Sequence, residues 1–362
     1  MVEAGTQRSP REIIREVADQ IPAIEPEWRG RALGHLDNLT KPRGSLGRLE
    51  EIAARLAGIQ QRDILDCKNK AIFTLAADHG VTEENVSAYP KAVTGQMVRN
   101  FLLGGAAINV LCRQFGIEVI VVDIGVDGKL DLATGLVDRK IANGTRNIAR
   151  GAAMDEKELA TAFEVGVELA AGAAERGCTL IGTGEMGIGN TTVASAMTAL
   201  LTGRPASQVT GAGTGLDSAG VARKIAVIER AIAVNRPNPS DALDILQKVG
   251  GLEIAGLTGL ILGGAARRLA VVVDGFISTA AAALACALEP RAGNFLFAAH
   301  RSSEPGHGAL LDLIAQRPLL DLEMRLGEGT GSALAMAVIE SAANLFNQMA
   351  TFSSARVSGA VA

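Results

Sequence analysis

The sequence has few aromatic residues and no strong bias toward charge of one sign. Aromatic side chains make up 3% of the 362 residues, whereas glycine alone occupies 42 positions. Small side chains in such numbers favour tight packing of helices on a sheet over an all-β sandwich. The formal net charge is −4 and no basic stripe is present, so the sequence predicts no nucleic-acid partner.

Cysteines are also scarce, and their spacing argues against a zinc site. Cys67, Cys112, Cys178 and Cys286 form no CxxC pair and show no ligand spacing with the four histidines. We therefore predict buried, reduced thiols in a cytoplasmic protein without a bound metal. Residues 1–12 lack the apolar segment of a signal peptide. No run of about 18 apolar residues is present either, so we expect no membrane span.

Helical patterns occupy both ends of the chain. Apolar residues recur at helical spacing in four segments, 11–21, 27–39, 46–60 and 332–350. We expect these helices to pack together, so that residues 1–65 and 325–362 form a small helical lobe. Residues 66–324 would then form a large catalytic domain.

Between the two ends the pattern changes to short apolar runs, each followed by a glycine-rich turn and a helical stretch. The runs cover 71–77, 118–124, 178–183, 268–273 and 295–299. Consecutive apolar residues are typical of strands buried on both faces of a parallel sheet, which predicts an α/β fold. Ligands of such sheets bind beyond the carboxyl ends of the strands. The polar residues near these ends therefore predict the site: Asp78, Asp123, Glu185, Asp274 and His300.

One glycine-rich turn, GEMGIGNTT at residues 184–192, directly follows an apolar run and precedes a helix. Its glycines allow backbone N–H groups to converge on an anion, and the helix N-terminus adds partial positive charge. No lysine follows in the place that a Walker motif requires. A tight turn without a ligand is the alternative, but the carboxylate of Glu185 within the turn favours a binding site.

Two further segments carry polar groups suited to a ligand. Glu328 stands between glycines just before a helix, where it is open to a ligand, although a solvated loop acid is the alternative. The segment 300–308 contains Arg301 and Ser302, which are donors for phosphate or ribose. Its two histidines, His300 and His307, lack the helical spacing of a metal pair.

Two other candidates are ambiguous from the sequence. Asp78 and His79 lie together at a strand end, but no nucleophile motif such as GxSxG accompanies them. A structural hydrogen-bonding role for this pair is at least as well supported as a chemical one. Lys224 lies in a predicted helix, where by itself it has the pattern of a solvated lysine.

Taken together, these segments resemble the nicotinate-nucleotide–dimethylbenzimidazole phosphoribosyltransferase family. The matching residues run in order across nearly the whole chain, and ten such segments in order form a specific pattern. They are LTKPRGSLGRLE (39–50), ADHGV (77–81), VSAYP (86–90), FLLGGAAINVL (101–111), GEMGIGNTT (184–192), GLDSAG (215–220), GGLEIAGLTG (250–259), VVVDGFISTAAA (271–282), HRSSEPGH (300–307) and RLGEGTGSALAM (325–336).

The resemblance implies a Rossmann-like parallel sheet with helices on both faces, a small helical lobe built from both termini, and a homodimer. It also implies an activity that uses no metal or other cofactor. The phosphoribosyl group of nicotinate mononucleotide is transferred to 5,6-dimethylbenzimidazole, which yields α-ribazole 5′-phosphate and nicotinate. The product supplies the lower ligand in cobalamin biosynthesis.

The resemblance also assigns roles residue by residue. Glu328 matches the family's general base and Glu185 a second acid of the active site. The positions that match phosphate contacts are Gly187, Ile188, Gly189, Lys224 and Ser302. The segment that lines the base pocket contains Ser87, Tyr89 and Gln96. Further candidate substrate contacts, chosen for their places in the turns and at a strand end, are Asn190, Arg301 and Asp274.

Other functions are less well supported. A Rossmann oxidoreductase requires GxGxxG after the first strand, whereas the first run here leads into ADHGV. A non-catalytic protein that binds nucleotides or corrinoids is disfavoured by two glycine-flanked glutamates, because acids beside a bound anion are costly. Adenine and phenols stay open as alternative bases.

Overall fold

The computed structural model describes residues 8–130 and 135–358. Its centre is a six-stranded sheet with the order β3-β2-β1-β4-β5-β6, and every neighbouring pair is parallel. This is the doubly wound order of Rossmann folds, in which the direction of winding reverses between β1 and β4. The predicted α/β fold with a Rossmann-like parallel sheet is confirmed.

Five of the strands coincide with the five predicted apolar runs. The strands are β1 (Lys70–Ala77), β2 (Glu118–Gly125), β3 (Leu136–Asp138), β4 (Leu180–Met186), β5 (Ala270–Val273) and β6 (Leu296–Ala298). The sequence did not predict β3. This strand is three residues long and lies at the sheet edge beside β2, so it needs no long apolar run.

The four helices expected from apolar spacing are present as α1, α2, α3 and α14. The helices are α1 (Pro10–Asp19), α2 (Pro26–Asp37), α3 (Arg48–Gln60), α4 (Val93–Leu103), α5 (Ala107–Phe115), α6 (Glu156–Glu175), α7 (Asn190–Thr202), α8 (Ala206–Val209), α9 (Ser218–Asn235), α10 (Ala242–Val249), α11 (Leu252–Ala266), α12 (Phe276–Leu288), α13 (His307–Leu313), α14 (Thr330–Gln348) and α15 (Phe352–Ala355).

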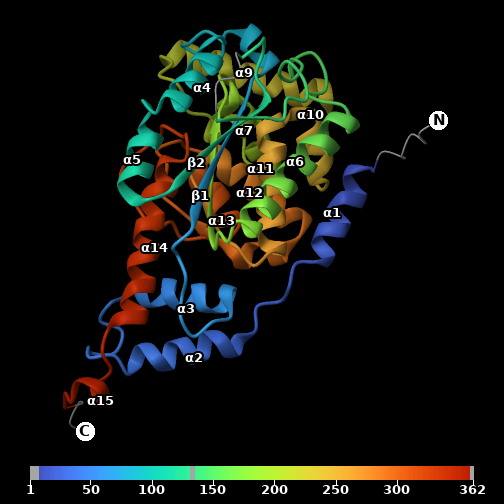
Figure 1. Ribbon diagram of the computed structural model, residues 1–362. Coiled ribbons are helices and arrows are strands. Elements are labelled where there is room, and N and C mark those ends of the chain that lie inside the picture. The colour runs from blue at the N-terminus through green and yellow to red at the C-terminus, as the bar shows by residue number, and fades with distance from the viewer. Residues whose placement is uncertain (1–7, 131–134, 359–362) are drawn as a thin grey trace.

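Helices cover both faces of the sheet (Figure 1). On one face α11 and α12 contact the central strands, with α6 packed behind α11; on the other lie α5 and α14. Side chains of β1 alternate between these layers. Leu75 faces α11 at Gly256, whereas Ile72 faces the start of α14 at Gly329. β1, β5 and β6 are therefore fully buried, as their continuous apolar runs predict, whereas the edge strand β3 is half-buried to exposed.

The pair α6 and α11 explains the abundance of small residues. Nearly all of α11 is buried, which requires a helix that is apolar all round. The two backbones touch directly: a Cβ at Gly166 would meet the carbonyl oxygen of Gly256, and one at Gly259 would meet that of Phe163. Larger side chains at these positions would push the helices apart.

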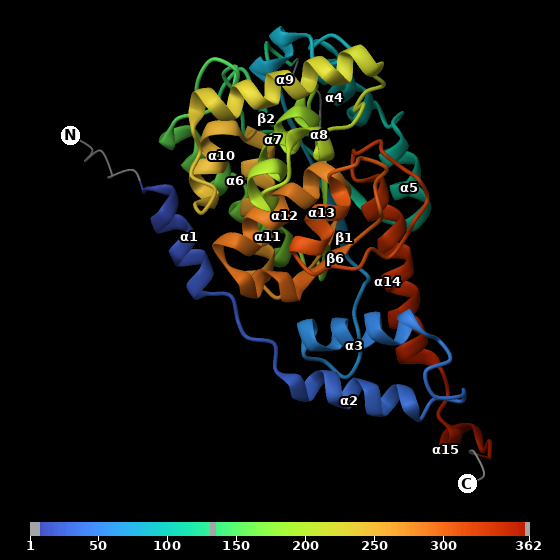
Figure 2. The same ribbon diagram turned by 180° about the vertical axis from the view of Figure 1, so that it is seen from behind.

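The remaining helices show how the chain ends are arranged. α2 and α3 pack on each other and on the lower part of α14, and extend away from the sheet (Figures 1 and 2). Leu39 bridges to Thr351 there, joining the two ends of the chain. In contrast, α1 packs against α6 and α11 beside the sheet. The predicted division into lobes stays a prediction, and its residues 1–7, 131–134 and 359–362 lie outside the described part.

The helix contact gives a test by substitution. We expect Gly259→Ala to lower the free energy of unfolding by about 1–3 kcal/mol, because its methyl group has no space against α6. Gly34→Ala is the matched control, since Gly34 lies in exposed α2 with nothing within 4 Å. It should stabilise by about 0.5–1 kcal/mol. Chemical denaturation measures both variants, and equal changes in their free energies of unfolding would contradict the close packing of α6 and α11.

Candidate active site

A cavity opens where the winding of the sheet reverses. Its volume is about 540 Å³, and its walls come from the end of β4, the start of α7, the start of α4 and several loops. Ligands of doubly wound sheets bind in this crevice outside the carboxyl ends of the strands. The cavity contains many of the predicted site residues: Tyr89, Glu185, Gly187, Ile188, Asn190, Ser302 and Glu328.

Glu328 reaches the cavity from an unusual turn. Gly327, Glu328 and Gly329 all have positive φ angles, +87°, +65° and +99°. The backbone is held by the strands below it: Thr74 Oγ1 donates to the carbonyl oxygen of Glu328 over 2.9 Å, and the N–H of Glu328 donates to the carbonyl of Glu185 over 3.3 Å. This turn directs the buried carboxyl group into the cavity wall.

The environment of the Glu328 carboxyl group shifts its proton affinity. Burial raises its pKa, the neighbouring Asp274 adds to the rise, and a hydrogen bond from the N–H of Ile108 opposes it. That N–H lies 3.2 Å from Oε2 at the start of α5. Among the described residues no hydrogen bond reaches Oε1, so both lone pairs of this oxygen are open to a proton from a ligand.

Asp274 supports this turn from behind. Its two carboxylate oxygens accept the N–H groups of Gly329 and Ser332 over 3.1 and 3.0 Å, at the start of α14. Asp274 is 1% exposed and does not line the cavity, although its sequence position predicted a substrate contact. Its geometry is that of a cap that orients Glu328.

Glu185 is a second carboxyl group in the cavity wall. It lies near the end of β4, is 6% exposed, and accepts a hydrogen bond from the side-chain amide of Asn190. Burial raises its pKa to about 8, and the nearby Asp274 and Glu253 carboxylates add to the rise. Glu185 is therefore mostly protonated at neutral pH, unlike an ordinary glutamate.

The glycine-rich turn leads into α7 as the sequence predicted. Gly187 and Ile188 line the cavity, and Gly189, with φ +98°, lies just behind them as the N-cap of α7. A Cβ at Gly187 would meet the carbonyl oxygen of Ala77, so no larger residue fits there. The first turn of α7 thus faces the cavity, which is the arrangement of an anion site.

Lys224 lies behind the start of α7 and is fully buried. Its ammonium group donates to Thr191 Oγ1 over 2.8 Å, and Thr191 lines the cavity. Burial lowers the pKa of Lys224 to about 8. The alternative of a solvated lysine is therefore wrong, because α9 turns this residue inward.

The segment 300–307 contributes unequally. Ser302 lines the cavity, and its N–H donates to Nδ1 of the buried His307 over 2.8 Å, which anchors the loop. Burial lowers the pKa of His307 to about 3, so this histidine stays neutral. Arg301 does not line the cavity. Its side chain is exposed, and its Nε lies 3.6 Å from Oδ2 of Asp321.

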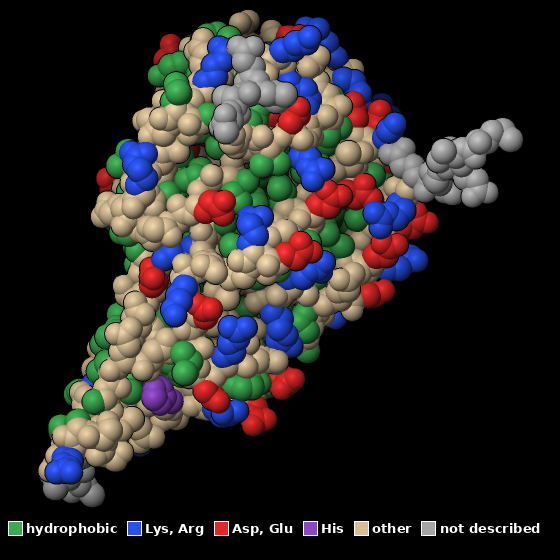
Figure 3. Space-filling model, viewed as in Figure 1, with side chains coloured by type: hydrophobic (Ala, Val, Ile, Leu, Met, Phe, Trp, Pro, Cys, Tyr) green, Lys and Arg blue, Asp and Glu red, His purple; other side chains and the backbone are tan. Residues whose placement is uncertain are grey.

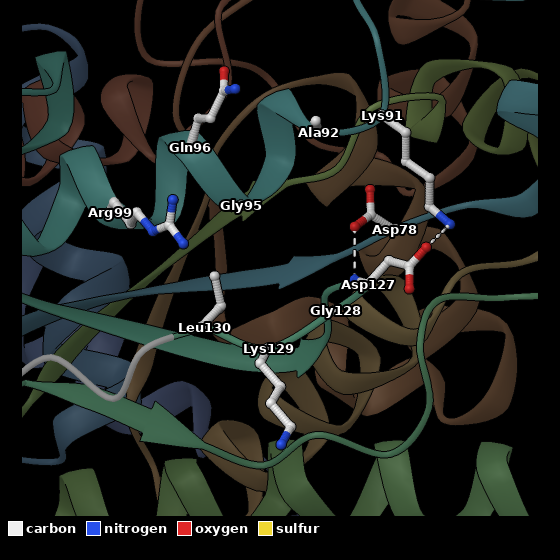
Figure 4. A pocket seen from close by; sticks show the side chains of 10 residues that line it. All are labelled: Asp78, Lys91, Ala92, Gly95, Gln96, Arg99, Asp127, Gly128, Lys129 and Leu130. Atoms are coloured by element: carbon white, nitrogen blue, oxygen red, sulfur yellow. Dashed lines mark hydrogen bonds and ion pairs between the residues drawn. The ribbon is translucent and has the colours of Figure 1, made fainter.

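The three residues predicted for the base pocket separate in space. Tyr89 lines the cavity mouth and is 55% exposed. Ser87 does not line the cavity, but its Oγ lies 3.1 Å from Oγ1 of Thr214, which does. Gln96 lines a second pocket, of about 480 Å³, on the other side of α4 (Figure 4). In that pocket Lys91 pairs with Asp127, and Arg99 lies on the same helix as Gln96.

Asp78 and His79 take structural positions. His79 Nε2 lies 2.8 Å from Oε1 of Glu253, and both side chains are fully buried. Asp78 accepts the N–H of Asp127 over 2.8 Å and borders only the second pocket. Neither residue lines the main cavity, so the geometry favours the structural alternative over a catalytic dyad.

Several cavity residues were not singled out from the sequence. Glu304 and Arg325 line the cavity and lie in the matched segments 300–307 and 325–336. These segments also contain the predicted site residues Ser302 and Glu328, and that proximity is the signal that could have indicated them. The apolar residues gave no such signal, because they have the same pattern as ordinary core positions: Val93, Met97, Met186, Phe276, Ile277 and Leu326.

Within residues 8–130 and 135–358, no three His, Cys, Asp or Glu side chains converge as metal ligands would. No helix in that part of the chain is long and apolar enough to cross a membrane. On the face shown in Figure 3, acidic and basic side chains are interspersed without a patch of one sign. The absence of metal, cofactor and nucleic-acid partners stays a prediction.

The sheet order and a helix start facing the cavity are typical of nucleotide-binding α/β enzymes, and comparison with known proteins identifies the class of this one. A family model described as "Phosphoribosyltransferase" matches residues 21–357. The chain is 54% identical over 345 residues to the nicotinate-nucleotide–dimethylbenzimidazole phosphoribosyltransferase of Geobacter sulfurreducens, covering 95% of this chain and 98% of the relative. A relative of the same name from Chloroflexus aggregans is 53% identical over 346 residues, with 96% and 98% covered.

Solved structures agree with this result. CobT from Thermus thermophilus superimposes with a TM-score of 0.89 at 46% identity, covering 92% of this chain and 100% of that one. The chain belongs to the nicotinate-nucleotide–dimethylbenzimidazole phosphoribosyltransferase family. The resemblance inferred from ten sequence segments is confirmed.

The turn that carries Glu328 gives a second test. A Cβ at Gly327 would meet Oε1 of Glu185, whereas Gly116, also at positive φ, has nothing within 4 Å. Alanine at either position costs about 1–2 kcal/mol of stability from the left-handed backbone. We expect only Gly327→Ala to lower kcat strongly, by roughly 100-fold, because it displaces two carboxyl groups. Steady-state assays beside thermal melts check this, and an equal loss of kcat in both variants would contradict it.

Proposed function

We propose that this chain transfers the phosphoribosyl group of nicotinate mononucleotide to 5,6-dimethylbenzimidazole, giving α-ribazole 5′-phosphate and nicotinate for the lower ligand of cobalamin. The observation that carries the proposal is a single cavity that combines an anion-binding helix start with the buried Glu328 carboxyl group. Relatives of this length and identity support the choice of substrates.

The cavity offers different chemistry to the two substrates. Val93, Met97 and Phe276 give it apolar surface, which suits a flat benzimidazole ring. The start of α7 and the hydroxyl of Ser302 suit the 5′-phosphate of the nucleotide, with the Lys224 ammonium behind Thr191. Holding both substrates in line contributes several kcal/mol, up to roughly 7–11 in favourable cases.

In the chemical step, one ring nitrogen of the benzimidazole attacks C1′ of the ribose. The new N–C1′ bond forms as the C1′–nicotinate bond breaks, and nicotinate leaves with that electron pair. The attacking ring gains positive charge, so its second nitrogen becomes acidic, and the proton passes to Oε1 of Glu328. Attack from the face opposite nicotinate converts a β-nucleotide into the α-anomer.

The two buried carboxyl groups take separate roles. Glu328 must be ionised to accept the proton, and a raised pKa makes it a stronger base near neutral pH. Glu185 keeps its proton at neutral pH, so it adds no second negative charge to the same cavity. Environments that separate two carboxyl groups in this way are characteristic of paired catalytic acids.

We propose further that the protein is a cytoplasmic homodimer with a large domain and a small helical lobe. Exposed apolar side chains support self-association: Leu326 and Tyr89 are 58% and 55% exposed at the cavity mouth, and Ile64 is 74% exposed. All four cysteines are unpaired, which supports a reducing compartment. Light scattering on a size-exclusion column measures the dimer directly.

The activity itself is tested with purified protein, nicotinate mononucleotide and 5,6-dimethylbenzimidazole. We expect nicotinate and α-ribazole phosphate in equal amounts by chromatography, at the same rate with and without a metal chelator. Adenine and phenols run in parallel decide the base preference. Binding of the nucleotide without release of nicotinate would favour the non-catalytic alternative and overturn the proposal.

Glu328→Gln tests the general base. The amide keeps the shape of the side chain but cannot take the proton, so we expect kcat to fall by a factor on the order of 100 to 10,000. The dissociation constant for the base should change little. Glu323→Gln, an exposed acid a few residues earlier, is the matched control and should keep full activity. A Glu328→Gln enzyme with most of its activity would refute the assignment.

The pH dependence gives an independent check on Glu328. Since only the ionised form accepts the proton, kcat/KM should fall as the pH drops through the pKa of this residue. Burial places that pKa above the ordinary 4.5. The acidic limb should therefore lie above pH 4.5 and disappear from the residual activity of Glu328→Gln. A limb at or below the ordinary value would contradict the buried environment.

A further inference from the structure

Three separate segments make up the phosphate side of the cavity, and two buried charged residues join them. These segments are the start of α7 at Thr191, the turn 211–214 and the loop 300–307. The Lys224 ammonium group donates to Thr191 Oγ1 over 2.8 Å and to the carbonyl oxygen of Gly211 over 3.4 Å. Lys224 therefore joins the first segment to the second.

Glu304 joins the second segment to the third. Its Oε1 accepts the N–H of Gly213 over 3.1 Å, and its own N–H donates to Ser302 Oγ over 3.3 Å. Glu304 is 7% exposed, and its Oε2 is buried without a hydrogen-bond partner. A buried carboxylate oxygen without a hydrogen-bond partner lowers the stability of the fold, because its desolvation is not compensated.

Two glycines in the turn between the two charged residues have no room for a side chain. A Cβ at Gly211 would meet Oε2 of Glu304, and a Cβ at Gly213 would lie 3.0 Å from Nζ of Lys224. The backbone of this turn thus passes between a carboxylate and an ammonium group. Gly213 lines the cavity, so the position of the turn decides the shape of the phosphate side.

Glu304 is the acidic group whose negative charge raises the pKa of Lys224. Burial lowers the pKa of Lys224 to about 8, and the Glu304 carboxylate opposes that fall. Neither α7, α8 nor the residues 210–216 carry a charged side chain. On α10, Lys248 and Asp244 pair with each other, and on α9 Arg223 donates to the carbonyl of Asn85. On the cavity side, Arg325 donates to the carbonyl of Gly213.

We infer that Glu304 is a positioning residue of the phosphate subsite, which holds the 211–213 turn in place and supplies the counter-charge that keeps Lys224 an ammonium ion. The inference rests on the proposed function. An acid beside a phosphate dianion opposes binding by its own charge. Glu304 favours binding nonetheless, because it preserves the cation and the backbone geometry that the phosphate requires.

The consequence is a pH-dependent affinity for the nucleotide substrate. As the pH rises through about 8, Lys224 loses its proton and KM for nicotinate mononucleotide should increase. Glu185, whose pKa is also about 8, ionises over the same range, so the contribution of Lys224 is the part of the rise that a change at Glu304 shifts. Without the carboxylate, this loss should occur at lower pH. The KM for the benzimidazole should not follow, since that ring carries no phosphate.

Glu304→Gln is the decisive variant, because glutamine keeps the acceptor for the Gly213 N–H and removes only the charge. We expect KM for nicotinate mononucleotide within about twofold of wild type at about pH 6.5, but raised roughly five- to tenfold at about pH 8, as a shift of about one pH unit requires. A structural role alone would leave the pH profile of KM unchanged. Glu323→Gln serves as the control for a lost surface charge.

Glu304→Asp separates the two parts of the inference. The shorter side chain keeps the charge but does not reach Gly213, so KM should rise at every pH while the pH of the increase stays at its wild-type value. In Lys224→Arg the cation cannot be lost in this range, so adding Glu304→Gln should produce no further pH shift.

The outcomes distinguish the failure of each proposal. If wild-type protein releases no nicotinate, the proposed function fails. If it does turn over and Glu304→Gln retains the wild-type pH profile of KM, the inference about Glu304 is wrong. Inorganic phosphate as a competitive inhibitor provides a second readout, and its inhibition constant should show the same pH shift.

Discussion

The positive-φ turn at Gly327–Gly329 is the constraint on which the active site depends. A glutamate in a left-handed conformation costs about 1–2 kcal/mol, and its buried carboxyl group adds a desolvation penalty. Hydrogen bonds from Thr74 and to Asp274 hold the turn, each with a net contribution of about 0.5–1.5 kcal/mol. The strain is thus offset by groups on β1 and at the end of β5, so the Glu328 carboxyl group is positioned by the rigid sheet rather than by a free loop.

Four acidic residues lie close together around this turn, and their surroundings assign them different tasks. Glu253 pairs with His79 under the glycine-rich turn, and Asp274 caps α14 through two N–H groups. Glu185 accepts from the Asn190 amide, and burial among the other acids raises its pKa and keeps it protonated at neutral pH. Glu328 also lines the cavity, where a hydrogen bond from the N–H of Ile108 opposes the rise of its pKa on burial. Identical functional groups therefore differ in role because their hydrogen-bond partners differ.

The sequence could predict elements whose pattern repeats along the chain. Buried strands show continuous apolar runs, and the turn at 184–192 combines glycines with a helix start, so β4 and α7 were predictable together with Glu185. β3 was not, because three residues paired at a sheet edge leave no periodic signal. The position of Gln96 was not predictable either: neighbouring residues of a helix are turned by about 100° from each other. On α4, Met97 therefore lines the main cavity, whereas Gln96 lines the second pocket.

The sequence by itself determined the α/β class, the family and the places of the glycine-rich turns that line the cavity, because hydrophobic period, glycine spacing and motif order are local properties of the chain. Only the tertiary structure decided which polar residues meet. Lys224 and Glu304 lie far apart in the sequence, yet both hold the same turn, since α9 and the loop after β6 converge on it. Burial, which shifts the pKa of Lys224 and Glu185 to about 8, is likewise a property of the packed molecule that no local pattern encodes.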